Sequence, residues 1–152
     1  MQPEQWKVLS GVCQRPGMFV TPATFDAVVH FIDGYHHATG CLNGFREWLV
    51  TVGEDGNNLT WVGLVRHHLN RSEVACDEAR KIERFGEWLQ QFYAYVEAFP
   101  SSREAMLRIY LDYHAWLTKR PWYQPGLPGY ISPEEYRRSL QVNEGAFGPR
   151  GG

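Results

Sequence analysis

The stretch IERFGEWLQQFYAYVEAFP, residues 82–100, decides the fold class. Its large apolar side chains alternate at intervals of three and four residues and are Ile82, Phe85, Leu89, Phe92, Val96 and Phe99. This spacing puts all of them on one side of an α-helix, and it is typical of a helix packed lengthwise against another. Pro100 cannot continue the helix. The sequence therefore predicts a long amphipathic helix within residues 72–99.

A second amphipathic helix is predicted directly after this one. Residues 101–104, SSRE, form a capping box, in which a serine at the helix start is followed three residues later by glutamate. The same spacing then continues through Met106, Ile109, Tyr113 and Trp116. Two such helices joined by a tight turn are expected to pack antiparallel as a hairpin. The seam on residues 82–99 can also pair across a homodimer, and its period does not choose between the two.

The first forty residues predict two helices separated by a bend. Residues 3–14, PEQWKVLSGVCQ, can form a short helix, which Arg15-Pro16-Gly17 ends. This bend is expected to deliver Met18 and Phe19 to the core. Thr21-Pro22 has the form of a helix start, with a hydroxyl cap followed by proline at the first helical position. The apolar residues of the second helix, which runs to Gly40, are Phe25, Val28, Val29 and Ile32.

Two shorter helices are predicted next. The inward residues of the first, which ends at Gly53 and the EDGNN turn, are Leu42, Phe45, Leu49 and Val52. Asn58 can cap the second, over residues 59–70. Its inward residues are Leu59, Val62, Val65 and Leu69. Beyond Arg120 the chain is rich in proline, glycine and aromatic residues, until Ser132-Pro133 begins a short final helix.

Length and composition fit one domain. The chain has 152 residues, of which 43% are hydrophobic, and it shows no internal repeat and no long alternating pattern of a strand. We therefore expect an all-α, single compact domain of about six helices over residues 1–140. It would contain a long antiparallel helix hairpin and a Pro/Gly-rich C-terminal segment, with a flexible tail over residues 141–152.

Charge and cysteine content limit the classes of function. The formal net charge is −2 and the basic residues form no block, so nucleic acid is a disfavoured partner. No apolar run approaches the roughly 18 residues that span a bilayer, so a soluble protein that binds no membrane is expected. Cys13, Cys41 and Cys76 lack the paired spacing of a zinc site, and no leader segment is recognised. A cytoplasmic protein with no cofactor is expected.

Motifs of catalysis are not found. The sequence contains no GxSxG, no HExxH and no phosphate-binding glycine loop, and its serines sit mostly where helix ends are predicted. The sequence therefore predicts a protein that is not an enzyme.

Residues 25–37, FDAVVHFIDGYHH, carry the most concentrated polar pattern. At about 100° per residue, one stripe of the second helix carries Asp26, His30, Asp33 and His37. The stripe is interpreted as a solvated or partner-binding face whose Asp and His pairs add little to helix stability. The alternative is a small metal-binding protein or metalloenzyme, with the ligand shell completed by His67, His68 or His114.

Aromatic and acidic residues in turns are the candidates for a protein interface. Aromatic residues make up 14% of the chain, and the ones expected at the surface are Trp61, Trp122, Tyr123 and Tyr130. A packing role for Trp122 and Tyr123 over a gap in the core is an equal alternative. The acidic groups that can attract a basic partner are Glu54 and Asp55 in the turn, Asp26 and Asp33, and Glu73, Asp77 and Glu78 on the long helix.

Four segments of the first half carry a resemblance to a known class. They are RPGMFV at residues 15–20, FxxxVxFIxGY at 25–35, GFREWL at 44–49 and NNLTW at 57–61. In this order they resemble small bacterial immunity-type proteins, which are encoded beside polymorphic or secreted toxins. The resemblance implies a cytoplasmic protein without catalysis that binds a cognate toxin or effector and blocks its active surface.

Overall fold

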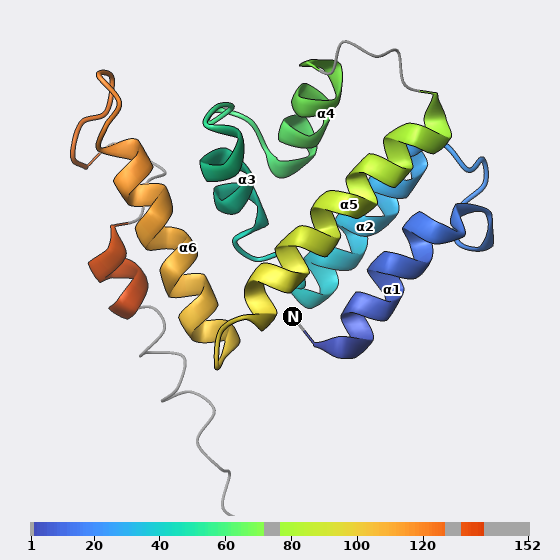
Figure 1. The fold of residues 1–152 in the computed structure, drawn as a ribbon, viewed down its shortest axis with the longest axis horizontal. Coiled ribbons are helices and arrows are strands. Elements are labelled where there is room, and N and C mark those ends of the chain that lie inside the picture. Colours follow the sequence, from blue (N-terminus) through green and yellow to red (C-terminus); the bar gives the residue numbers. More distant parts are fainter. Residues whose placement is uncertain (1, 72–76, 127–131, 139–152) are drawn as a thin grey trace, which may run out of the picture.

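The computed structural model of the chain describes residues 2–71, 77–126 and 132–138, which form helices and turns and no strand. Its elements in chain order are α1 (Pro3–Gln14), the 3₁₀ turn η1 (Pro16–Met18), α2 (Phe25–Thr39), α3 (Phe45–Gly53), α4 (Trp61–Arg71), α5 (Glu78–Glu97) and α6 (Ser102–Leu117). A short helix at 133–138 lies against α6 (Figure 1). The expected all-α compact domain is confirmed. No helix among the described residues has the length and apolar character needed to cross a membrane.

Helix α5 is the centre of the fold. The predicted seam from Ile82 to Val96 is buried, and α1 and α2 lie alongside it (Figure 1). Aromatic rings from four other helices contact its rings, in the pairs Trp6–Tyr93 at 4.7 Å, Phe25–Phe85 at 6.2 Å, Phe45–Phe92 at 5.1 Å and Trp61–Phe85 at 5.9 Å between centroids. The seam is therefore covered mainly by elements that precede it in the chain.

The predicted hairpin of α5 and α6 is present. The Ser101 hydroxyl accepts a hydrogen bond from the Glu104 backbone N–H at 3.2 Å, which confirms the capping serine. The two helices diverge widely from this turn, and α6 also packs against α3 (Figure 1). The buried residues of α6 are Ala105, Ile109, Tyr113 and Leu117.

Helix α2 begins later than predicted. Thr24, and not Thr21, is its N-cap, because the Thr24 hydroxyl accepts a hydrogen bond from the Ala27 N–H at 3.3 Å. The Thr21-Pro22 peptide bond is cis and belongs to the connecting turn. Pro22 therefore precedes the helix and is not the first helical residue that the Thr-Pro pattern indicated.

Helix α4 is capped by Thr60, so the predicted Asn58 cap is wrong. The Thr60 hydroxyl accepts a hydrogen bond from the Gly63 N–H at 3.2 Å. The helix therefore starts at Trp61, which becomes the first residue of its inward stripe. The buried residues of this helix are Trp61, Leu64, Val65 and Leu69, whereas Leu59 and Val62 are only partly buried.

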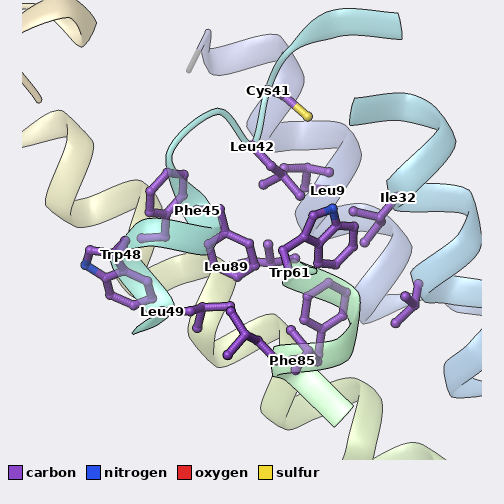
Figure 2. Packing of buried hydrophobic residues seen from close by; sticks show 14 of the residues in the cluster. Leu9, Ile32, Cys41, Leu42, Phe45, Trp48, Leu49, Trp61, Phe85 and Leu89 are labelled. Carbon is purple, nitrogen blue, oxygen red and sulfur yellow. The ribbon is translucent and has the colours of Figure 1, made fainter. Parts of the chain in front are cut away.

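Trp61 is buried in the core, so the expectation that it is exposed is wrong. Its ring lies among Leu9, Ile32 and Phe85 in the hydrophobic cluster (Figure 2). Its indole N–H donates a hydrogen bond to the Asp33 carboxylate at 3.1 Å, so the polar end is satisfied while the ring is buried.

Three side chains expected in the core point outward. Met18 is 71% exposed, and Phe19 is 38% exposed although its ring lies edge-on to Phe31; Val20 packs against the core instead. Val52 is 60% exposed. Helix α3 presents Gly53 to α4, which turns Val52 toward solvent.

The final helix is confirmed where it is described. The Ser132 hydroxyl accepts a hydrogen bond from the Glu135 N–H at 3.2 Å, and the Tyr136 ring stacks on Tyr110 at 4.1 Å between centroids. Several expectations fall outside the described residues: the flexible tail 141–152, a start of the long helix at residue 72, and the roles of Glu73, Cys76 and Tyr130.

Candidate functional site

The acidic residues of the α2 stripe make contacts to α4. The Asp26 carboxylate accepts a hydrogen bond from Arg66 at 2.9 Å, and that of Asp33 accepts one from Trp61. Asp33 also lies 3.7 Å from the His37 imidazole, while His30 is exposed. Asp33 therefore has a structural role that the sequence pattern did not indicate.

The histidines proposed for the metal alternative are held elsewhere. The His67 imidazole lies 3.2 Å from the Asp55 carboxylate, and His68 packs edge-on to Trp88 at 5.9 Å between ring centroids. The His114 ring faces Tyr123 at 6.1 Å. Within residues 2–71, 77–126 and 132–138, no three His, Cys, Asp or Glu side chains are grouped in a way that could hold a metal ion.

The turn after α3 carries two neighbouring carboxylates, one hydrogen-bonded within the protein and one exposed. The Asp55 carboxylate accepts hydrogen bonds from the Gly56 N–H at 2.7 Å and from Arg71 at 2.9 Å. The Gly56 N–H and the His67 imidazole lower the pKa of Asp55 below its usual range. Glu54 is exposed and adopts a left-handed backbone conformation, with φ of 53°. No described residue forms a hydrogen bond or ion pair with its side chain.

This turn forms one wall of a hollow of about 380 Å³ on the molecular surface. The opposite wall comes from the end of α6 and the segment after it. The lining residues are Glu54, Asp55, Gly56, Asn57, Asn58, Trp116, Arg120 and Trp122. Three predicted interface residues, Glu54, Asp55 and Trp122, are therefore brought together from distant parts of the sequence.

The aromatic side of the hollow combines exposed and covered groups. Trp122 is 47% exposed and lies edge-on to Trp116, with 6.4 Å between ring centroids. The Arg120 guanidinium lies over the Trp116 ring, 4.1 Å from its centroid. The Trp116 indole N–H and the Arg120 Nε–H are covered by protein and have no hydrogen-bond partner among the described residues. Tyr123 is half-buried and packs on the core, so only Trp122 of this aromatic pair is well exposed.

Arg46 fastens the turn to the helical body. From α3, its side chain donates hydrogen bonds to the Leu59 carbonyl at 2.9 Å and to the Asn57 carbonyl. It also donates to the Glu47 carboxylate at 3.1 Å. The Tyr113 hydroxyl, on α6, donates to the Asn57 side-chain oxygen. These bonds hold the turn between α3 and α6, so the shape of the hollow is largely formed in advance.

Sequence reasoning missed several residues of this site, among them two that hold the turn and two of its aromatic wall. Arg46 and Tyr113 carry no local signal, because their partner Asn57 lies in a loop whose position the sequence does not reveal. Trp116 lies in the last turn of α6, and Arg120 follows the end of that helix at Leu117. The cluster of Trp116, Arg120 and Trp122 within seven residues of sequence is a signal that could have found the aromatic wall.

A larger groove of about 710 Å³ runs between α1 and α5, and of the predicted interface residues it contains Asp77 alone among the residues that line it. Its charged side chains include Arg80 and Glu87, which are 3.8 Å apart, and Arg80 also pairs with Glu83. Cys13 lies in this groove, where burial raises the pKa of its thiol to about 12, so the reactive thiolate form is suppressed.

The hollow is the better candidate for a binding site. It combines the carboxylate of Glu54, the ring of Trp122 and the side-chain amide of Asn58 on a firmly held frame. These groups can form an ion pair, an aromatic contact and hydrogen bonds with an incoming molecule. Comparisons of this chain with protein-family models, with curated proteins and with solved structures find no match.

Proposed function

We propose that this chain is a non-catalytic protein-binding module, and specifically an immunity-type protein that binds and neutralises a cognate toxin or effector in the bacterial cytoplasm. The observation that carries the proposal is the hollow, where an exposed tryptophan and a carboxylate without a described partner share one rigid surface. Exposed tryptophan beside charged groups is the usual composition of an interface anchor.

The local frame supports the same reading. GFREWL and NNLTW are two of the segments in the resemblance to immunity-type proteins, and Arg46 of the first binds the Asn57 carbonyl of the second. A rigid frame lowers the entropy cost of ordering loops when a partner binds. The turn therefore suits a surface that binds another protein without rearrangement.

Photo-crosslinking in native cells tests this function. A photoreactive residue at position 122 is expected to capture one protein. The same residue in place of the exposed Lys7 of α1, a helix that lies away from the C-terminal end of α6 (Figure 1), is expected to capture none. The captured protein, expressed alone, is expected to stop growth, and co-expression of this chain is expected to restore it. Capture of a protein that is harmless when expressed alone would refute the immunity role, and equal capture from both positions would refute the proposed face.

A further inference from the structure

We infer that the hollow beside the 54–58 turn receives a basic side chain, arginine or lysine, from the partner protein. In this arrangement the Glu54 carboxylate supplies the opposite charge and the Trp122 ring supplies a wall. The inference rests on the proposed function, and it adds the chemical character of the partner's contact residue.

Glu54 is the charged group in the hollow that remains available to a partner. The neighbouring Asp55 is already bound by Gly56 and Arg71, whereas Glu54 has no described partner and is exposed. Arg120, the cation of the hollow, lies over the Trp116 ring, and its Nε is covered. The Glu54 carboxylate is therefore the acidic group of the hollow that can pair with an incoming cation.

The tryptophans favour a cation of flat or extended shape. Arg120 on Trp116, at 4.1 Å, shows that a guanidinium stacks on an indole within this same hollow. Trp122 lies edge-on to Trp116 and is 47% exposed. An arginine from a partner can extend its apolar stem along this ring while its charged end reaches Glu54.

The turn is held in place before any partner binds. Arg46 and Tyr113 bind Asn57 from two helices, so the turn that carries Glu54 and Asp55 is tied to both α3 and α6. A small probe should therefore bind weakly but specifically, because little of its binding energy is spent on ordering the site.

Titration with single amino-acid amides tests the inference, with the indole N–H resonances of the six tryptophans as the readout. N-acetyl-arginine amide is expected to shift the Trp122 and Trp116 signals saturably, with Kd on the order of 1–10 mM. Trp116→Phe and Trp122→Phe variants assign the two signals. N-acetyl-citrulline amide, which is neutral and nearly isosteric, and N-acetyl-glutamate amide are expected to bind at least about tenfold more weakly.

Glu54→Gln is the decisive variant, since it removes the charge of an exposed side chain and leaves the fold intact. It is expected to weaken binding of the arginine probe about tenfold, whereas Glu97→Gln, an exposed carboxylate on α5, leaves binding unchanged. Circular dichroism and thermal unfolding of both variants confirm that each is folded.

Three outcomes would overturn the inference: no saturable shift with the arginine probe, tighter binding of the glutamate probe, or unchanged binding in Glu54→Gln. Each of them leaves the proposed function standing if position 122 still crosslinks a toxin. Specific binding of the arginine probe without any crosslinked toxin supports the hollow's preference and refutes the immunity role instead.

Discussion

At the scale of single residues, Gly53 and Glu54 form an unusual pair at the end of α3. The left-handed conformation that favours glycine falls on Glu54, with φ of 53°, and the glycine stands one position earlier. A Cβ atom added at Gly53 would lie 2.2 Å from the His68 ring. Glycine is therefore needed at 53 for the approach of α4, and the adjoining residue adopts the strained conformation with its carboxylate at the hollow.

Opposite effects on stability are expected from substitutions at these two positions. Gly53→Ala should lower the free energy of unfolding by about 1–3 kcal/mol, because the added methyl group displaces the His68 ring. Glu54→Gly should raise it by up to about 1 kcal/mol, since relief of backbone strain outweighs the added entropy of the unfolded chain. Urea denaturation measures both. Stabilisation by Gly53→Ala, or a loss of more than 1 kcal/mol in Glu54→Gly, would contradict this account.

At the scale of helices, the start of α2 depends on a side chain from α5. The Glu78 carboxylate accepts a hydrogen bond from the Phe25 N–H at 2.7 Å, and Thr24 satisfies the N–H of Ala27. The Lys81 ammonium and the Phe25 N–H lower the pKa of Glu78 below its usual range. Two helices far apart in sequence are thus joined by a charged cap.

Glu78→Ala should destabilise the protein by about 1 kcal/mol at neutral pH, through loss of this cap. Because the folded-state pKa of Glu78 is lowered, its contribution is complete above the ordinary glutamate range and declines as the pH falls through the folded-state pKa. Urea denaturation at pH 7 and pH 3.5 measures both effects. Glu83→Ala, which removes an exposed partner of Arg80, is the control and should cost less than about 0.5 kcal/mol. Equal losses in the two variants would exclude a capping role.

The connection from α2 to α3 contains a histidine that is needed in its neutral form. The Nδ1 atom of His36 accepts a hydrogen bond from the Leu42 N–H at 3.1 Å. Burial and the charge of His37 lower the pKa of His36, and Asp33 partly opposes them. Burial also lowers the pKa of His68, as do the charges of His67 and Arg71. Protonation of either imidazole is therefore easier in the unfolded chain.

Stability should consequently fall on mild acidification. A lowered folded-state pKa means that the contribution of His36 is complete above the unfolded value near 6.5 and is lost as the pH drops below it. The free energy of unfolding, measured with urea from pH 7.5 to 5.5, should decrease. His36→Gln, which keeps an acceptor without a titrating group, should make this decrease smaller, whereas the exposed His30→Gln should not. If the free energy of unfolding of His36→Gln decreases between pH 7.5 and 5.5 as much as that of the original chain, His36 is not the cause of the decrease.

At the scale of the whole molecule, the fold was more predictable than the site. Periodicity identified the buried seam of α5 and the capping serine of α6, because these features depend on neighbours in sequence. The orientation of Trp61 and Val52 depended on where α4 begins and how closely it approaches α3, which local patterns do not determine. Glu54, Asp55 and Trp122 were recognised individually, but the hollow that joins them depends on bonds from Arg46 and Tyr113 across the fold.

Substitution of Arg46 should therefore lower the stability of the fold and also weaken binding at the hollow. Its guanidinium binds the Leu59 and Asn57 carbonyls and the Glu47 carboxylate together, which a single ammonium cannot reproduce. Arg46→Lys is expected to lower the free energy of unfolding by about 2 kcal/mol. It should also weaken binding of N-acetyl-arginine amide, although Arg46 does not line the hollow.

The matched control for this variant is Arg66→Lys, which alters an exposed ion pair with Asp26. This change should cost less than about 0.5 kcal/mol and leave binding of the probe unaltered. Tyr113→Phe removes only the hydroxyl that binds Asn57. Its losses of stability and of affinity for the probe should therefore both be intermediate between those of Arg46→Lys and Arg66→Lys. If Arg46→Lys destabilises the protein but binds the probe as the original chain does, the hollow does not depend on the Arg46 bonds, and another part of the fold must hold the turn in place.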